Sequence, residues 1–170
     1  RQYVETVDEN IKSAEVWGEK SVEDDKIEKL SKSARLQHSE PQVRRRAAQS
    51  LGREGEDAAP YVDQLALLLN DIVPNVRSSA AKSFGNLGSI GAAHAEQLTT
   101  LLDDEDANVR TATAIALGKL GQPLLPKDAI RSLAACLEDN SPDVRKAALD
   151  VLTQMEGGAA QEAAAVLAHQ

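Results

Sequence analysis

The sequence predicts an all-α fold, a right-handed α-solenoid in which about four antiparallel helical hairpins stack between terminal helices. A pattern of about 33 residues occurs four times, and self-similarity at such a period is typical of repeat architectures. Within each copy the apolar residues follow the 3.6-residue period of an α-helix. The chain is 42% hydrophobic but only 2% aromatic. A core built from small residues suits closely packed helices.

Each copy of the pattern contains a valine followed directly by an arginine. The four valines are Val43, Val76, Val109 and Val144. Positions within a copy are counted from this valine, which stands at position 0. Positions 0, +4, +8 and +11 then fall on one side of a helix and are expected to face the core.

The second helix of each hairpin, the B helix, is predicted to begin near Pro41, Pro74, Ala107 and Pro142. Proline at the first helical position loses no hydrogen bond and has its φ angle already set. The first three B helices are expected to end near Gly55, Gly88 and Gly121, and the last near residue 156. The first helix of each hairpin, the A helix, is expected over 22–37, 58–70, 91–103 and 126–138. A two-residue insertion at 122–127 is expected to form a loop.

Three regions follow from these patterns. Residues 1–20 show helical spacing of apolar residues and are expected to form an amphipathic helix that caps the array. Residues 21–156 hold the four repeats. Residues 157–170 are rich in alanine and are expected to form an incomplete fifth repeat or a C-terminal cap.

The run Leu-x-x-Leu-Leu-x-Asp, a short turn, then Val-Arg-x-x-Ala-Ala-x-x-Leu-Gly-x-Leu-Gly matches residues 98–121 almost throughout. This pattern resembles the HEAT-like repeat, in the short form also seen in phycobilin lyases. The resemblance implies an inter-repeat ladder between the arginine at +1 and the aspartate at −5, a structural role and not a ligand site. Its members would be Arg44, Arg77, Arg110, Arg145, Asp71, Asp104 and Asp139. The aspartate in the turn before each B helix is expected to accept the arginine's hydrogen bonds. His38 replaces the aspartate in the first copy, which puts the ladder in doubt there.

Charge and composition exclude several classes of protein. The net charge of −8 and the pI of about 4.9 argue against general nucleic-acid binding, which needs a basic surface. No run of 18 apolar residues exists, so no membrane span is predicted. The single cysteine, Cys136, rules out an internal disulfide and is expected to be a small buried residue. A reducing compartment is compatible with this, and the location is otherwise unassigned.

No catalytic, metal or cofactor site is predicted. His38, His94 and His169 are isolated from one another in sequence, whereas a metal site needs clustered ligands. HEAT-like iron hydroxylases carry His-Glu dipeptides, and this sequence has none. No glycine-rich phosphate loop occurs. The chain is therefore not expected to be an enzyme.

One surface is unusually basic for so acidic a protein. Positions +2, +3, +6, +9 and +10 of the B helices are predicted to point away from the core, Ser78, Ser79 and Ala112 among them. This ridge carries six basic residues against one acid, Asp150, with one large aliphatic residue. The candidate partner-binding residues are Arg45, Arg46, Arg53, Lys82, Ile115, Lys119 and Lys146. A merely solvated lysine-rich face remains the alternative.

The sequence favours a non-catalytic protein–protein interaction scaffold, an accessory subunit of a larger assembly. Its partner is expected to be a protein with an acidic segment that contacts the basic ridge. A first alternative is an enzyme component resembling the phycobilin lyases, whose repeats hold a tetrapyrrole. A second is a nucleic-acid-binding module resembling HEAT-like DNA glycosylases, which the net charge makes unfavourable.

Overall fold

The computed structural model describes residues 27, 30–121, 124–126 and 128–155. It divides into two units, Arg1–Ser31 and Lys32–Gln170, and the repeats belong to the second. The helices expected over 1–20 and within 157–170 lie outside the described residues. Those that are described form helices and turns and no strand, which confirms the all-α prediction.

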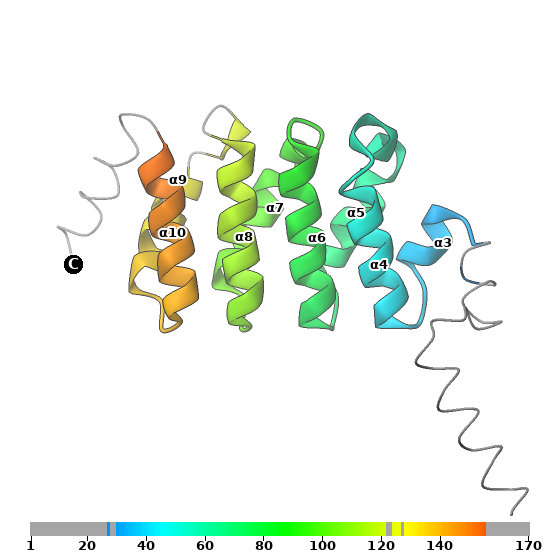
Figure 1. Ribbon diagram of the computed structural model, residues 1–170, viewed down its shortest axis with the longest axis horizontal. Coiled ribbons are helices and arrows are strands. Elements are labelled where there is room, and N and C mark those ends of the chain that lie inside the picture. Colours follow the sequence, from blue (N-terminus) through cyan, green and yellow to red (C-terminus); the bar gives the residue numbers. More distant parts are fainter. Residues whose placement is uncertain (1–26, 28–29, 122–123, 127, 156–170) are drawn as a thin grey trace, which may run out of the picture. The chain divides into compact units, whose positions relative to one another are not determined.

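The B helices form one layer, in which each packs against the next in chain order (Figure 1). They are α4 (Pro41–Leu51), α6 (Pro74–Leu87), α8 (Ala107–Leu120) and α10 (Pro142–Gln154). All four begin at the predicted residue. α6 and α8 end where predicted, directly before Gly88 and Gly121, whose φ angles of 57° and 75° favour glycine. α4 ends four residues before Gly55, and α10 ends two residues before the predicted 156.

The A helices are less regular than predicted. Three of them have an α-helical centre followed by a 3₁₀ turn. In that turn, carbonyl groups accept hydrogen bonds from N–H groups three residues later instead of four. Their segments are η1 (Gly55–Tyr61), α5 (Val62–Leu67), η2 (Leu68–Asn70), η3 (Gly91–His94), α7 (Ala95–Thr100), η4 (Leu101–Asp103), α9 (Ala129–Ala135) and η6 (Cys136–Glu138).

The predicted continuous helix over 22–37 is wrong in one respect. Leu30 and Ser31 are not helical, and the A helix of the first copy is represented by the short α3 (Lys32–Leu36). Lys32 and Arg35 stand on this helix where later copies carry leucine, so less apolar surface holds it against α4. Leu36 is its one buried residue.

Each interior B helix has four faces. The predicted core face is correct, since Val76, Val109, Leu117 and Leu120 are buried. The predicted outward face is too wide, because Ser79 and Ala112 at +3 are only 5% and 1% exposed. Ser78 at +2 is buried as well, although the residues at +2 of the other copies are exposed or half-buried. Positions +3 and +7 face the preceding B helix, and positions +1, +5 and +9 face the following one. Only positions −1, +2, +6 and +10 are left to point outward.

Glycine at +9 sets how closely the B helices approach. A Cβ atom added to Gly85 would lie 2.7 Å from Ala116 Cα, and one added to Gly118 would lie 2.6 Å from Val151 Cγ2. A Cβ on Gly52 would lie 2.7 Å from Ser83 Oγ. Each contact joins +9 of one copy to +7 of the next. The layer is therefore packed as tightly as a glycine allows.

The arginine at +1 binds the aspartate at −5 of the following copy through two parallel hydrogen bonds. Arg110 donates from Nε to Asp139 Oδ2 at 2.7 Å and from Nη2 to Asp139 Oδ1 at 2.8 Å. Arg44 binds Asp71 and Arg77 binds Asp104 in the same way. The expectation that the preceding turn supplies the carboxylate is wrong, since that turn supplies a main-chain oxygen.

The third guanidinium nitrogen, Nη1, donates to a main-chain oxygen in the turn before the arginine's own B helix. Arg110 Nη1 donates to the carbonyl oxygen of Asp104 at 2.7 Å, and Arg145 Nη1 donates to that of Asp139 at 2.6 Å. Arg145 is exposed and pairs with no carboxylate in the described part of the chain. Each of the first three arginines therefore ties the turn before its own B helix to the turn before the next.

The aspartates also shape their own turns. Asp71, Asp104 and Asp139 each accept a hydrogen bond at Oδ1 from the backbone N–H two residues later. His38 performs the same task, because its Nδ1 accepts from the N–H of Glu40 at 3.1 Å. The first copy thus keeps the turn without the carboxylate.

The ladder lowers the pKa of its carboxyl groups. Burial acts to raise the pKa of Asp71 and Asp104, but the hydrogen bonds from the arginine and the backbone N–H outweigh it, so both pKa values are lowered. For Asp139 the hydrogen bond from Arg110 is the largest cause of its lowered pKa. The folded state therefore favours the ionised carboxylates.

We expect Arg110→Ala to lower the free energy of unfolding by about 1–3 kcal/mol, because it leaves the half-buried Asp139 without its charged partner. Urea denaturation measures this. Arg131→Ala is the matched control, since Arg131 is exposed and lies 3.5 Å from Asp128 within one helix turn. The control should change the free energy by less than about 0.5 kcal/mol. Equal effects of the two variants would contradict the ladder's stabilising role.

We expect acid to weaken the stack through the same carboxyl groups. A lowered folded-state pKa stabilises the fold above the unfolded value, about 3.9, and this stabilisation is lost as the pH falls through the folded value. The urea midpoint should therefore drop between about pH 5 and pH 2. Asp104→Asn should reduce this drop, whereas the exposed Asp57→Asn should leave it unchanged. An identical pH profile for Asp104→Asn and the parent would count against this account.

We expect Gly85→Ala to destabilise the protein by at least about 1 kcal/mol, although alanine is the better helix former. The added methyl group would overlap the backbone of Ala116, which cannot yield as a flexible side chain could. Thr153→Ala, at the same +9 position of the fourth copy, is exposed and should have almost no effect. Thermal unfolding of both variants tests the close approach, and a stabilised Gly85→Ala would refute it.

Candidate interaction surface

The outward residues of the four B helices form one surface, named here the B-helix strip. It comprises positions −1, +2, +6 and +10 of each copy, which lie opposite the core face of each helix. Most of these side chains are exposed or half-buried. The strip consists of Gln42, Arg45, Gln49, Arg53, Asn75, Ser78, Lys82, Asn86, Asn108, Thr111, Ile115, Lys119, Asp143, Lys146, Asp150 and Gln154.

Charge is distributed unevenly along the strip. At the strip positions of the first two copies stand Arg45 on α4, Arg53 in the turn that follows α4 and Lys82 on α6, and no acidic residue. The first of the three is half-buried and the other two are exposed. α8 and α10 contribute two lysines, Lys119 and Lys146, together with Asp143 and Asp150, so their share of the strip is neutral. The basic character predicted for the whole ridge is thus confined to the half formed by α4 and α6.

Arg46 lies at the edge of the strip. Its position, +3, faces the preceding B helix in the later copies, but in the first copy the arginine side chain is exposed. It adds a fourth positive charge beside the basic half.

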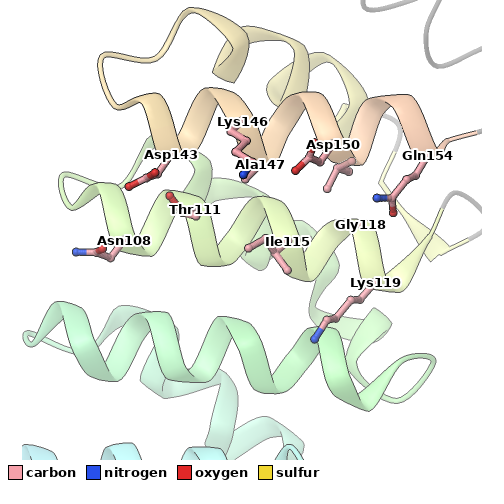
Figure 2. Close-up of a pocket in the computed structure, with 11 residues that line it drawn as sticks. Asn108, Thr111, Ile115, Gly118, Lys119, Asp143, Lys146, Ala147, Asp150 and Gln154 are labelled. Atoms are coloured by element: carbon pink, nitrogen blue, oxygen red, sulfur yellow. The ribbon is translucent and has the colours of Figure 1, made fainter.

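Side-chain hydrogen bonds bridge the first two pairs of B helices. Gln49 Nε2 donates to Ser79 Oγ at 3.3 Å, which joins α4 to α6. Lys119 Nζ donates to Asn86 Oδ1 at 2.8 Å, which joins α8 to α6. Lys119 therefore turns toward α6 (Figure 2). No comparable side-chain bond joins α8 to α10 among the described residues.

A groove of about 570 Å³ lies between α8 and α10 (Figure 2). Its apolar lining comes from Ile115 and Gly118 on α8 and from Ala147 and Val151 on α10. Ile115 is 41% exposed. The polar lining consists of Asn108, Thr111, Lys119, Asp143, Lys146, Asp150 and Gln154. The structure thus brings Ile115, Lys119 and Lys146 together. It places Arg45 on α4, Arg53 in the turn after α4 and Lys82 on α6, away from the groove.

Sequence reasoning overlooked position −1. Gln42, Asn75, Asn108 and Asp143 occupy it and are exposed in all four copies. The signal was available, since every copy carries a polar residue directly before the buried valine. Position −1 lies on the same helix side as +6 and +10, so these residues widen the strip.

Among the described residues, the side chains with metal-binding or nucleophilic chemistry lie apart from one another. No cluster of three metal-ligating side chains occurs within the described residues. Cys136 is buried, and burial raises the pKa of its thiol to about 11, so the reactive thiolate is scarce at neutral pH. His94 lies 3.1 Å from Asp63 and packs its ring against Phe84. None of the described helices combines the length and apolar content that crossing a membrane requires.

Known proteins resemble this chain in fold and in repeat pattern. The crystal structure of an engineered protein, determined by the Northeast Structural Genomics Consortium, is similar with a TM-score of 0.60 and 20% sequence identity, over 83% of this chain and 68% of the other. At that identity the likeness concerns the fold alone. No curated protein matches in sequence. A sequence profile of HEAT repeats matches residues 62–153 and 95–170, which together make up more than half of the chain. The chain therefore belongs to the HEAT-repeat family.

Proposed function

We propose that this protein is a non-catalytic interaction module, an accessory subunit that binds a partner protein through the B-helix strip. HEAT repeats generally mediate protein–protein interaction as scaffolds. The observation that carries the proposal is the segregation of charge. In a chain with 27 acidic and 19 basic residues, the α4–α6 half of the strip holds three basic residues and no acid.

The partner we propose carries an acidic segment that contacts this basic half. Single exposed ion pairs contribute only about 0–1 kcal/mol each. Several acting together steer association and fix the register of the partner, and they weaken as salt rises. A hydrogen bond from Nε of the half-buried Arg45 to Gln42 Oε1, at 2.9 Å, orients the Arg45 side chain.

The two alternative functions have less support in the described surface. The groove lining contains no aromatic ring that could stack on a tetrapyrrole, as a phycobilin-lyase-like role would favour. Nucleic-acid binding would be opposed by electrostatic repulsion, because the protein has a net charge of −8 and nucleic acid is a polyanion. An acidic protein segment needs only the local basic half.

We expect the triple variant Arg45→Glu, Arg53→Glu, Lys82→Glu to lose its partner while remaining folded, because all three side chains avoid the core. Affinity capture with mass spectrometry identifies the partner, and titration with that partner at about 50 and 300 mM salt measures binding. The parent should bind more weakly at the higher salt. Arg131→Glu, an exposed charge reversal on α9, is the control and should bind like the parent. Undiminished binding by the triple variant at both salt concentrations would refute the basic half as the contact surface.

A further inference from the structure

Ile115 occupies a position where the fold does not require an apolar residue. The other three copies place Gln49, Lys82 and Asp150 at +6, and all of them fold into the same B helix. Ile115 is nevertheless an isoleucine, 41% exposed, in the middle of the groove (Figure 2). Its apolar surface is therefore available to another molecule, and contributes to the core only in part.

The groove is open because one long side chain points away from it and small residues line it. Lys119 is drawn toward α6 by its bond to Asn86. The facing positions on both helices carry small groups, Gly118 on α8 and Ala147 on α10. An aliphatic side chain of a partner could contact Ile115 and Val151 there and lose its exposure to water.

Apart from Lys119, the polar side chains around the groove have no side-chain hydrogen-bond partner among the described residues. The amides of Asn108 and Gln154 each offer a donor and an acceptor, which match the free N–H and C=O groups of an extended backbone. Asp143, Lys146 and Asp150 alternate in sign along α10, so the groove attracts neither a strongly acidic nor a strongly basic residue.

We propose that the groove between α8 and α10 binds one aliphatic side chain of the same partner segment whose acidic residues contact α4 and α6. This inference rests on the proposed function and adds to it the second contact and its spacing. Neighbouring packed helices lie about 8–10 Å apart. The midpoint between α8 and α10 is two such steps, about 16–20 Å, from the midpoint between α4 and α6. An extended chain rises about 3.3 Å per residue, so about five or six residues separate the acidic cluster from the aliphatic anchor.

Selection of random 16-residue peptides displayed on phage tests the proposal with the full chain as bait. We expect the enriched peptides to combine an acidic cluster with a leucine, isoleucine, valine or methionine about five or six residues away. Fluorescein-labelled synthetic copies with the interval shortened to two residues, or lengthened to ten, should bind about tenfold more weakly than the selected spacing.

Two isoleucine variants provide the matched comparison. Ile115→Ser should weaken binding of the selected peptide about tenfold, because the anchor loses its apolar contact. Ile72→Ser truncates an isoleucine that is 87% exposed outside the strip, and it should leave binding unchanged. The three polar residues at +6 of the other copies indicate that Ile115→Ser folds, and circular dichroism checks this.

The outcomes separate this proposal from the proposed function. Enriched peptides that are acidic but have no aliphatic anchor, and that bind Ile115→Ser as well as the parent, would overturn the groove and leave the basic half standing. Enriched peptides without acidic residues, bound equally by the parent and the Arg45→Glu, Arg53→Glu, Lys82→Glu variant, would overturn both. Loss of binding in both the charge-reversal variant and Ile115→Ser, with Ile72→Ser unaffected, would support both.

Discussion

The bidentate bond between an arginine of one copy and an aspartate of the next holds the array in register. Both side chains are largely shielded from water, so this contact differs from an exposed surface ion pair. The arginine's remaining donor is satisfied by a carbonyl oxygen of its own turn, and the aspartate also caps its own turn. One pair of residues therefore fixes two turns and the distance between two helices.

This register determines which parts of a B helix are free to vary. Positions +1, +3, +5, +7 and +9 face the neighbouring B helices. Small residues such as Gly85 and Ala116 at these positions permit the close approach. The core face is equally constrained. The outward positions are the ones at which the copies differ in charge and polarity, and there Lys82, Ile115 and Asp150 replace one another. The residues of the strip can thus vary without disturbing the stack.

The periodic features of the fold could be predicted from sequence, and the features that depend on neighbouring copies could not. Proline or a capping residue marks each B-helix start, so those boundaries were correct. The spacing alone does not say whether Arg110 reaches back to Asp104 or forward to Asp139, because both lie beside it once the chain folds. Helical periodicity identifies one buried face, so it missed the burial of Ser79 against α4. The groove depends on the direction that Lys119 takes, which no sequence pattern specifies.

The pairing between successive copies bears on how such a chain can change in length. Each ladder bond joins an arginine to the first aspartate turn that follows it, 27 or 29 residues later. The longer interval contains the two-residue insertion, which lies between the B helix α8 and the A helix of the next copy, and the bond still forms. An in-frame duplication of one 33-residue period would preserve every pair, wherever within the period the duplication begins. The ladder therefore makes gene duplication a route to a longer B-helix strip, with four outward positions gained at each step and no further ladder arginine left without its aspartate.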